Sequence, residues 1–276
     1  MLSKYSLVSL SDSTHFDFGN GLWKGKKPPY TTVTVIRNTN FTSNGRIDLS
    51  DVAILEVEVS QFKTRKLIQG DVIIERSGGG PKQPVGRVVF FDIKDGKYSY
   101  SNFTSRIRVI SKSFEPLFVF YFLHNFYLEG KTEQFQAHTT GIRNLDFNKY
   151  KENISIPLLQ LSEQLKISYV LNTVQQAIEK QEQLIRTTTE LKKALMQKLF
   201  TEGLYGEPQK ETEIGLVPES WNVSRMSELN TIIQSGNTPR RINKSSFKGN
   251  IPWVKTLDLN GGLVVIRLLL MILINI

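Results

Sequence analysis

The chain has 276 residues, of which 39% are hydrophobic and 22% are charged, and its formal net charge at pH 7 is +9. This composition supports a hydrophobic core and excludes a wholly disordered chain, and the absence of cysteine excludes disulfides and thiolate metal sites. Most of the positive excess lies before residue 162, where it would suit a phosphate-rich partner or serve solubility alone.

Residues 1–158 are predicted to form one α+β domain. The start of the chain has no apolar signal-peptide core, which favours a cytoplasmic protein. Short β-branched or apolar runs bounded by turn residues predict strands at 5–10, 31–36, 72–74, 85–91, 107–110 and 153–157. The apolar run at 114–126, introduced by Glu115 and Pro116, predicts a buried helix.

A glycine loop follows the predicted strand at 72–74 and carries three basic residues, Arg76, Lys82 and Arg87. No Gly-Lys-Ser/Thr and no helix pattern follow the glycines, which excludes a Walker A loop. We expect a loop whose backbone and arginines approach a nucleic-acid backbone. The alternative is a plain β-hairpin turn.

A second polar loop, residues 138–145, contains threonine, arginine and asparagine side chains that can hydrogen-bond to bases or phosphates. It precedes the last predicted strand of the domain. The alternative is a helix-to-strand turn with Gly141 at its bend.

No catalytic constellation stands out. Asp71 and Glu75 are spaced like nuclease carboxylates, but Ser77 stands where metal-assisted cleavage would need a lysine. Ser60 and Lys63 fit a Ser-x-x-Lys pattern that is short enough to arise by chance, and its partner motifs are absent. The three histidines show no metal-ligand spacing. The sequence therefore predicts a chain without catalytic residues and without a metal.

Residues 162–202 contain neither glycine nor proline and predict a helix of roughly 60 Å, with Ser162 as its N-cap. Apolar residues recur at three- and four-residue steps, with polar breaks at Gln181 and Thr188, as in a coiled coil. The alternative is a helix that lies on its own domain, but the helix is too long for this to hold over its whole length. The stripe expected to meet another helix consists of Ile167, Leu171, Val174, Ile178, Ile185, Leu191, Leu195 and Leu199.

The chain turns polar after Gly203, which predicts a linker. From Trp221 the sequence echoes the start of the chain in order, spacing and residue class, and indicates the beginning of an internal repeat. The copy ends in an apolar run, 263–276, which is shorter than the ~20 residues of a membrane-spanning helix. We expect a truncated second domain whose tail comes from a shifted reading frame, which sequencing of the encoding DNA would test.

Five segments carry a resemblance to a known family: Gly70–Gly80, Thr139–Leu145, Ile154–Gln164, Ile214–Trp221 and Ile251–Thr256. In combination they resemble the specificity (S) subunit of type I restriction–modification enzymes, over residues 1–262. The resemblance implies target-recognition domains that each read half of a split DNA sequence. It also implies two long helices that pack antiparallel, as a spacer and as a dock for methyltransferase (M) subunits.

The same resemblance implies partners that do the chemistry. The M subunits use S-adenosylmethionine, a restriction (R) subunit adds ATP- and Mg-dependent translocation and cleavage, and the S subunit binds no cofactor and no membrane. The expected domains are a target-recognition domain (1–158), a spacer helix (159–205), and a linker with a truncated second recognition domain (206–276). Without a second helix in the chain, pairing of two copies through the long helix is expected.

Candidate DNA contacts are loop side chains that can donate to bases or phosphates. They are Lys24, Lys26, Lys27, Arg37, Asn38, Asn40, Arg76, Lys82, Gln83, Arg87, Thr139, Thr140 and Arg143. The alternative from another class is a coiled-coil scaffold that never touches DNA. Salt-dependent binding to double-stranded DNA separates the two.

Overall fold

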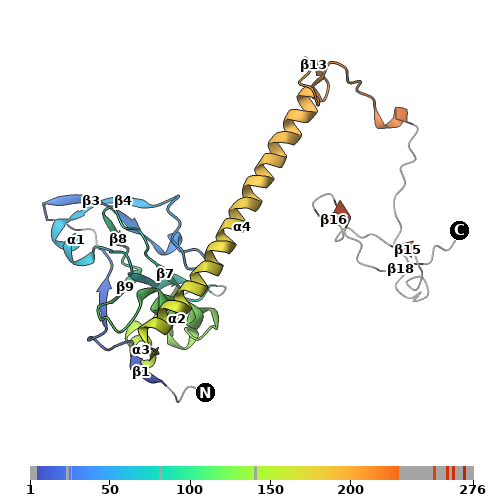
Figure 1. The fold of residues 1–276 in the computed structure, drawn as a ribbon. Coiled ribbons are helices and arrows are strands. Elements are labelled where there is room, and N and C mark those ends of the chain that lie inside the picture. The colour runs from blue at the N-terminus through green and yellow to red at the C-terminus, as the bar shows by residue number, and fades with distance from the viewer. Residues whose placement is uncertain are drawn as a thin grey trace. The chain divides into compact units, whose positions relative to one another are not determined.

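A computed structural model describes residues 5–22, 25, 27–80, 83–139 and 142–229, with the backbone of four short strands beyond them. It divides into two compact units, residues 1–191 and 192–276. The strands of the first unit are β1 (Ser6–Ser9), β2 (Phe16–Asn20), β3 (Tyr30–Ile36), β4 (Ala53–Glu58), β5 (Val72–Glu75), β6 (Ser77–Gly79), β7 (Val88–Phe90), β8 (Tyr98–Tyr100), β9 (Thr104–Val109), β10 (Gln136–Thr139), β11 (Ile142–Leu145) and β12 (Ser155–Leu158). The helices are α1 (Val59–Arg65), α2 (Pro116–Leu128), α3 (Phe147–Asn153) and α4 (Leu161–Glu202) (Figure 1). This content confirms the predicted α+β class with a long helix.

The strands form small sheets rather than one large one. The largest has the order β2-β9-β5-β7 and is antiparallel throughout. A second sheet has the order β4-β3-β8, in which β3 and β8 are parallel. Strand β5 is buried at all four positions, which is why its first three residues are all apolar and do not alternate with polar ones. The antiparallel pair β1–β12 brings the start of the chain beside the segment that leads into α4.

Helix α2 covers the core as the sequence predicts. The Glu115 carboxylate accepts hydrogen bonds from the backbone N–H groups of Leu117 and Phe118, and Pro116 opens the first turn. A side-chain acceptor before the helix and proline at its start both favour initiation at this point. Phe120 and Leu123 are almost fully buried and belong to the main hydrophobic cluster together with β5 and β9.

Helix α4 is attached to its domain at two points through polar side chains. At the first, the carboxamide of Gln164, 0% exposed, accepts from the Glu115 N–H at 2.9 Å and donates to two backbone carbonyls, also at 2.9 Å. At the second, Arg46 donates to Glu179 at 2.8 Å and to Asn172 at 2.9 Å. Two separated contacts fix the direction of this part of α4 against the recognition domain.

Two details of α4 differ from the sequence prediction. The helix begins at Leu161 and the Gln160 carbonyl accepts the first N–H groups, so Ser162 is wrong as N-cap because it lies inside the first turn. Ile167 packs against the main hydrophobic cluster, so its assignment to the exposed stripe is also wrong. The other seven stripe residues, from Leu171 to Leu199, are between 41% and 58% exposed.

After α4 the chain forms a hairpin of β13 (Gln209–Thr212) and β14 (Gly215–Pro218). The polar stretch predicted as a linker is thus organised locally by backbone pairing, although its sequence lacks an apolar pattern. The 3₁₀ helix η3 (Met226–Leu229) follows, and then the backbones of β15 (Ile251–Pro252), β16 (Leu259–Asn260), β17 (Leu263–Val264) and β18 (Leu270–Met271).

Most of the predicted repeat and of the apolar tail lies outside the described residues, so the truncation stays a prediction. The predicted domain boundaries also stay predictions. Within the part of the chain that the structure describes, no helix combines the length and the apolar character that a membrane crossing requires.

His124 on α2 gives the fold a pH dependence that can be measured. Its ring stacks on Phe120 with 5.4 Å between centroids, and burial lowers the pKa of His124 from an ordinary value of about 6.5. The folded state therefore disfavours the protonated ring, so the contribution of His124 is fully present above about pH 6.5 and is lost as the pH falls from there through the lowered pKa of the folded state.

We expect the urea midpoint of the wild type to fall more steeply between pH 8 and pH 5 than that of His124→Phe, which keeps a ring but does not titrate. Carboxylates titrate equally in both proteins, so the difference between the two curves isolates the histidine. Parallel curves would contradict this account.

Candidate nucleic-acid interface

The two polar loops predicted separately from the sequence meet in one small sheet. Its order is β10-β11-β6, and Ser77 of β6 lies opposite Asn144 of β11. The Ser77 hydroxyl donates to the Asn144 Oδ1 at 2.6 Å. The glycine loop joins the antiparallel strands β5 and β7, so the hairpin alternative describes its fold. The second loop is a β-hairpin, which corrects the helix-to-strand turn.

The glycine loop requires a glycine at position 78. Gly78 has a φ of +100°, and a Cβ there would lie 2.6 Å from the side-chain nitrogen of Asn38. That nitrogen donates to Glu75 Oε1 at 3.1 Å and to the Ser77 carbonyl at 3.2 Å. Asn38 therefore fixes the path of the backbone into β6. The sequence predicted Asn38 only as a DNA contact and did not indicate this structural role.

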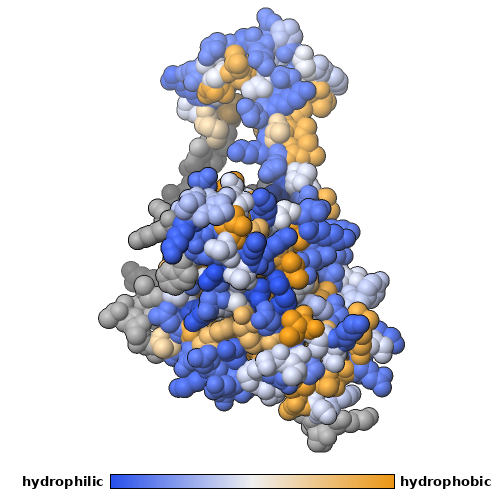
Figure 2. Space-filling model, turned by 90° about the vertical axis from the view of Figure 1, so that its left-hand side faces the viewer, coloured by the Kyte–Doolittle hydropathy of each residue, from blue (hydrophilic) through white to orange (hydrophobic). Residues whose placement is uncertain are grey.

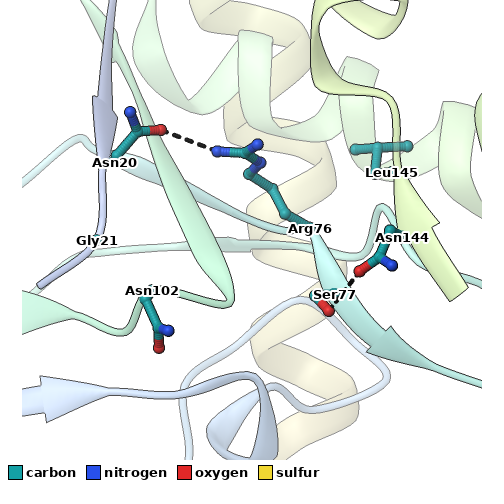
Figure 3. Close-up of a pocket in the computed structure, with 7 residues that line it drawn as sticks. All are labelled: Asn20, Gly21, Arg76, Ser77, Asn102, Asn144 and Leu145. Atoms are coloured by element: carbon teal, nitrogen blue, oxygen red, sulfur yellow. Dashed lines mark hydrogen bonds between the residues drawn. The ribbon is translucent and has the colours of Figure 1, made fainter. Parts of the chain in front are cut away.

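A polar hollow of about 370 Å³ opens beside this sheet (Figure 3). Its walls come from the end of β2, the β5–β6 junction, the turn between β8 and β9, and β11. The lining residues are Asn20, Gly21, Arg76, Ser77, Asn102, Asn144 and Leu145. Segments far apart in the sequence thus bring one cation and several amide and hydroxyl groups to a single opening.

Arg76 is the cation of this hollow. Its Nη1 donates to Asn20 Oδ1 at 2.9 Å and to Ser105 Oγ at 3.3 Å, and Figure 3 shows the guanidinium extended toward Asn20. The guanidinium also lies over the Phe147 ring, 5.3 Å from its centroid. Burial lowers the pKa of Arg76 because partial removal from water disfavours the charged form.

Two predicted DNA contacts are engaged inside the domain instead. Arg87 donates to both carboxylate oxygens of Glu75, at 2.8 and 2.9 Å, and to two backbone carbonyls. Asn40 is 3% exposed and its amide donates to the carbonyls of Asp48 and Asp51. Because these donors are already used, we leave Arg87 and Asn40 out of the proposed DNA contacts.

The remaining predicted contacts fall into two groups. On the surface, Arg37 pairs with Asp51 at 3.3 Å, Arg143 donates to Gln136 at 3.4 Å, and Lys27 and Gln83 are exposed. Lys24, Lys26, Lys82 and Thr140 lie outside the described residues, and only the backbone of Thr139, in β10, is described.

Sequence reasoning missed Asn20 and Asn102 as members of the hollow. Both stand where a strand ends or turns: Asn20 precedes Gly21 at the end of β2, and Asn102 lies in the turn before β9. Asparagine is common in such turns for local reasons, so its type alone gave no signal of a shared site.

The carboxylates considered for metal-dependent cleavage are neutralised by arginines. Asp71 and Glu75 are 0% and 1% exposed. Arg108 binds Asp71 through two nitrogens, at 2.6 and 2.7 Å, and Arg87 holds Glu75 in the same manner. Among the described residues no group of three or more histidine or carboxylate side chains could hold a metal.

A larger hollow of about 1000 Å³ adjoins the polar one along β3 and β4, and Asn102 lines both. Its walls include exposed apolar side chains such as Ile54 and Leu55. The face of the molecule that carries these strands and α1 is mainly hydrophilic, with hydrophobic groups in scattered spots (Figure 2). A mainly polar face of this kind is typical of contacts with nucleic acid rather than of a permanent protein interface.

Comparison with known proteins gives consistent matches. Residues 10–187 match a family model described as the type I restriction modification DNA specificity domain. The chain is 36% identical over 127 residues to the type I restriction enzyme MjaVIII specificity subunit of Methanocaldococcus jannaschii, covering 46% of this chain and 29% of that protein.

A second relative from the same organism, the putative type I restriction enzyme MjaX specificity subunit, is 24% identical over 183 residues, which cover 66% of this chain and 42% of the relative. A solved chain from work on complex assembly and conformational transition of the type I R-M system aligns with a TM-score of 0.47 and 22% identity, covering 74% of this chain and 47% of that one. The chain thus spans less than half the length of the curated relatives it matches.

Proposed function

The chain belongs to the type I restriction–modification DNA specificity family, since the family model matches residues 10–187, and on that premise we propose that it recognises a specific sequence in double-stranded DNA. The observation that carries DNA binding is the polar hollow at the edge of the β10-β11-β6 sheet, and the match to a DNA specificity domain supports the sequence-specific part of the proposal. It combines the guanidinium of Arg76 with amide side chains from three other segments. Such groups hold phosphates and base edges in protein–DNA complexes.

We propose further that this chain only recognises DNA, and that methyltransferase and restriction subunits supply S-adenosylmethionine-, ATP- and Mg-dependent chemistry. The internal pairing of Asp71 and Glu75 with arginines supports this division, because neither carboxylate is open to a metal or a water nucleophile. The chain would then work where DNA and these subunits meet, in the cytoplasm.

The long helix α4 is proposed to act as spacer and as docking surface. Its apolar stripe beyond Leu171 is about half exposed in the single chain, and a stripe with this spacing is completed by another helix. The occupant would be α4 of a second copy, which would place two recognition domains on one DNA molecule. The methyltransferase subunits would bind the resulting helix pair.

The same stripe favours a second candidate function, a coiled-coil scaffold without DNA binding. DNA affinity of the full chain, alone and co-purified with its methyltransferase subunit, separates the two. We expect the logarithm of the binding constant to fall linearly with the logarithm of salt concentration, and methylation to map to one repeated sequence. The scaffold alternative would be correct if neither preparation bound DNA in a salt-dependent way.

A further inference from the structure

Arg76 differs from four other arginines of the first unit in what neutralises it. Those four each have a carboxylate partner, and the pairs are Arg46–Glu179, Arg87–Glu75, Arg106–Asp17 and Arg108–Asp71. Among the described residues no carboxylate lies within ion-pair distance of Arg76, and its acceptors are the neutral Asn20 and Ser105. A half-buried cation without an anion is costly, so the site is suited to an anion from outside the chain.

The surroundings of Arg76 suit a small anion with several acceptor oxygens. The carboxamide of Asn102 is exposed and makes no hydrogen bond among the described residues, and the amide of Asn20 lies at the other side of the same opening. The hollow of about 370 Å³ has room for a phosphate group together with its water. Guanidinium and amide N–H donors around one opening are the usual partners of phosphate oxygens.

The guanidinium is poorly placed to read a base. Bidentate contact with a guanine edge needs two N–H groups of the arginine fork aimed into the groove. Nη1 of Arg76 is held by Asn20 and Ser105, and its Nε is buried, which leaves Nη2 for an incoming group. The Phe147 ring below the guanidinium also restricts it to this position.

From these observations we infer that the Arg76 hollow binds one phosphodiester group of the DNA backbone and fixes the register of the recognition domain without reading a base. This inference rests on the proposed DNA-recognition function. The binding energy of the site is therefore independent of sequence, while specificity comes from other side chains.

The test compares Arg76→Gln with Arg76→Lys and with Arg65→Gln, in the full chain. Arg65 is a matched control because it is half-buried, because its side chain makes only a 3.4 Å contact to a hydroxyl among the described residues, and because it does not line the hollow. We expect Arg76→Gln to weaken binding by the same factor, about tenfold, on duplexes of unrelated sequence. The slope of log K against log salt should become shallower by about 0.9, the value for one phosphate. Arg76→Lys should keep the slope, and Arg65→Gln should keep both quantities.

A second measurement is independent of any loss of folding. Duplexes with a single neutral methylphosphonate are bound to the wild type, to Arg76→Lys, which keeps the charge, and to Arg76→Gln, which does not. One backbone position should weaken the wild type and Arg76→Lys but should change the binding of Arg76→Gln little, and this position should stay constant relative to the target sequence.

Each possible result of these experiments supports or overturns the assignment of Arg76 to a phosphodiester. A loss confined to some sequences, with an unchanged salt slope, would show that Arg76 reads a base and would overturn the inference. Equal binding by Arg76→Gln and wild type would overturn it as well. Calorimetric saturation with inorganic phosphate, abolished in Arg76→Gln while DNA binding is unchanged, would show a site for free phosphate instead. If the wild type itself lacks salt-dependent DNA binding, the proposed function fails before this site is tested.

Discussion

Replacing Arg87 by methionine is expected to lower the free energy of unfolding by about 3–5 kcal/mol, the cost of leaving a buried charge without its partner. Glu75, the partner, has a side chain that is 1% exposed, and that of Arg87 is 16% exposed. The methionine keeps most of the volume of the arginine stem, so the loss comes from the uncompensated carboxylate. Urea unfolding followed by circular dichroism gives the free energy directly.

The double variant Arg87→Met with Glu75→Gln should recover most of this loss, because glutamine at position 75 removes the charge and can still accept from Asn38. The matched control is Arg37→Met. Its partner Asp51 has a side chain that is 92% exposed, and a surface pair of this kind contributes less than about 1 kcal/mol. If Arg87→Met and Arg37→Met cost the same, the ion pair with Glu75 does not stabilise the fold.

This expected cost changes how Arg87 is tested for DNA binding. A triple substitution of Arg76, Lys82 and Arg87 would reduce DNA affinity through unfolding even if Arg87 never met DNA. Substitution of Arg76 alone separates the two effects, because no carboxylate among the described residues would lose its ion-pair partner. The interface and the core of this domain thus both use arginine, and the presence of a buried carboxylate decides which role each one has.

The sequence did contain a signal that distinguishes a structural arginine from a DNA-binding one, but this signal lies in strand β5 and not beside the arginine. Strand β5 is apolar up to Glu75 and is buried throughout, and a carboxylate that ends such a strand needs a cation inside the fold. Position in a glycine loop suggested an outward role for Arg87 and Arg76 alike. Only the tertiary pairing of β5 with β7 shows that Arg87 turns inward, toward Glu75.

What was predictable depended on the range of the interactions. Helix α2 followed from Glu115, Pro116 and the apolar run after them, all within a few residues. The polar hollow depended on contacts such as that between Ser77 and Asn144, 67 residues apart, which no periodicity encodes. Segment 209–218 forms a hairpin through backbone pairing, which its polar side chains did not indicate.

Helix α4 shows both limits within one element. Its length followed from the absence of glycine and proline. Its division into a bound part and an exposed part did not, because the domain binds it through Gln164, Ile167, Asn172 and Glu179 and not through the apolar stripe from Leu171 onward. The polar attachment leaves the stripe on another side of the helix, turned away from those contacts by the helical spacing.

Serine at Val174, Ile178 and Ile185 is therefore expected to abolish pairing between copies of the chain. The three side chains are 54%, 46% and 58% exposed in the single chain. Covering the exposed half of each contributes about 1 kcal/mol, and two copies bring six such side chains to the helix pair. The total of about 6 kcal/mol should raise the dissociation constant by roughly 10⁴-fold, which sedimentation equilibrium measures directly.

The control carries the same three serines on the opposite side of α4, at Gln176, Gln183 and Thr187, which are also exposed. Helical spacing places these residues about half a turn from the stripe, so the control changes helix propensity without touching the interface. It should pair like the wild type. Because nothing in the described part of the first unit covers the stripe, a wild type that stays monomeric at every concentration, with the stripe variant equally active with its methyltransferase, would remove α4 as the pairing element. The attachment of α4 through Gln164 and Arg46 would then serve only to hold the helix on its own domain.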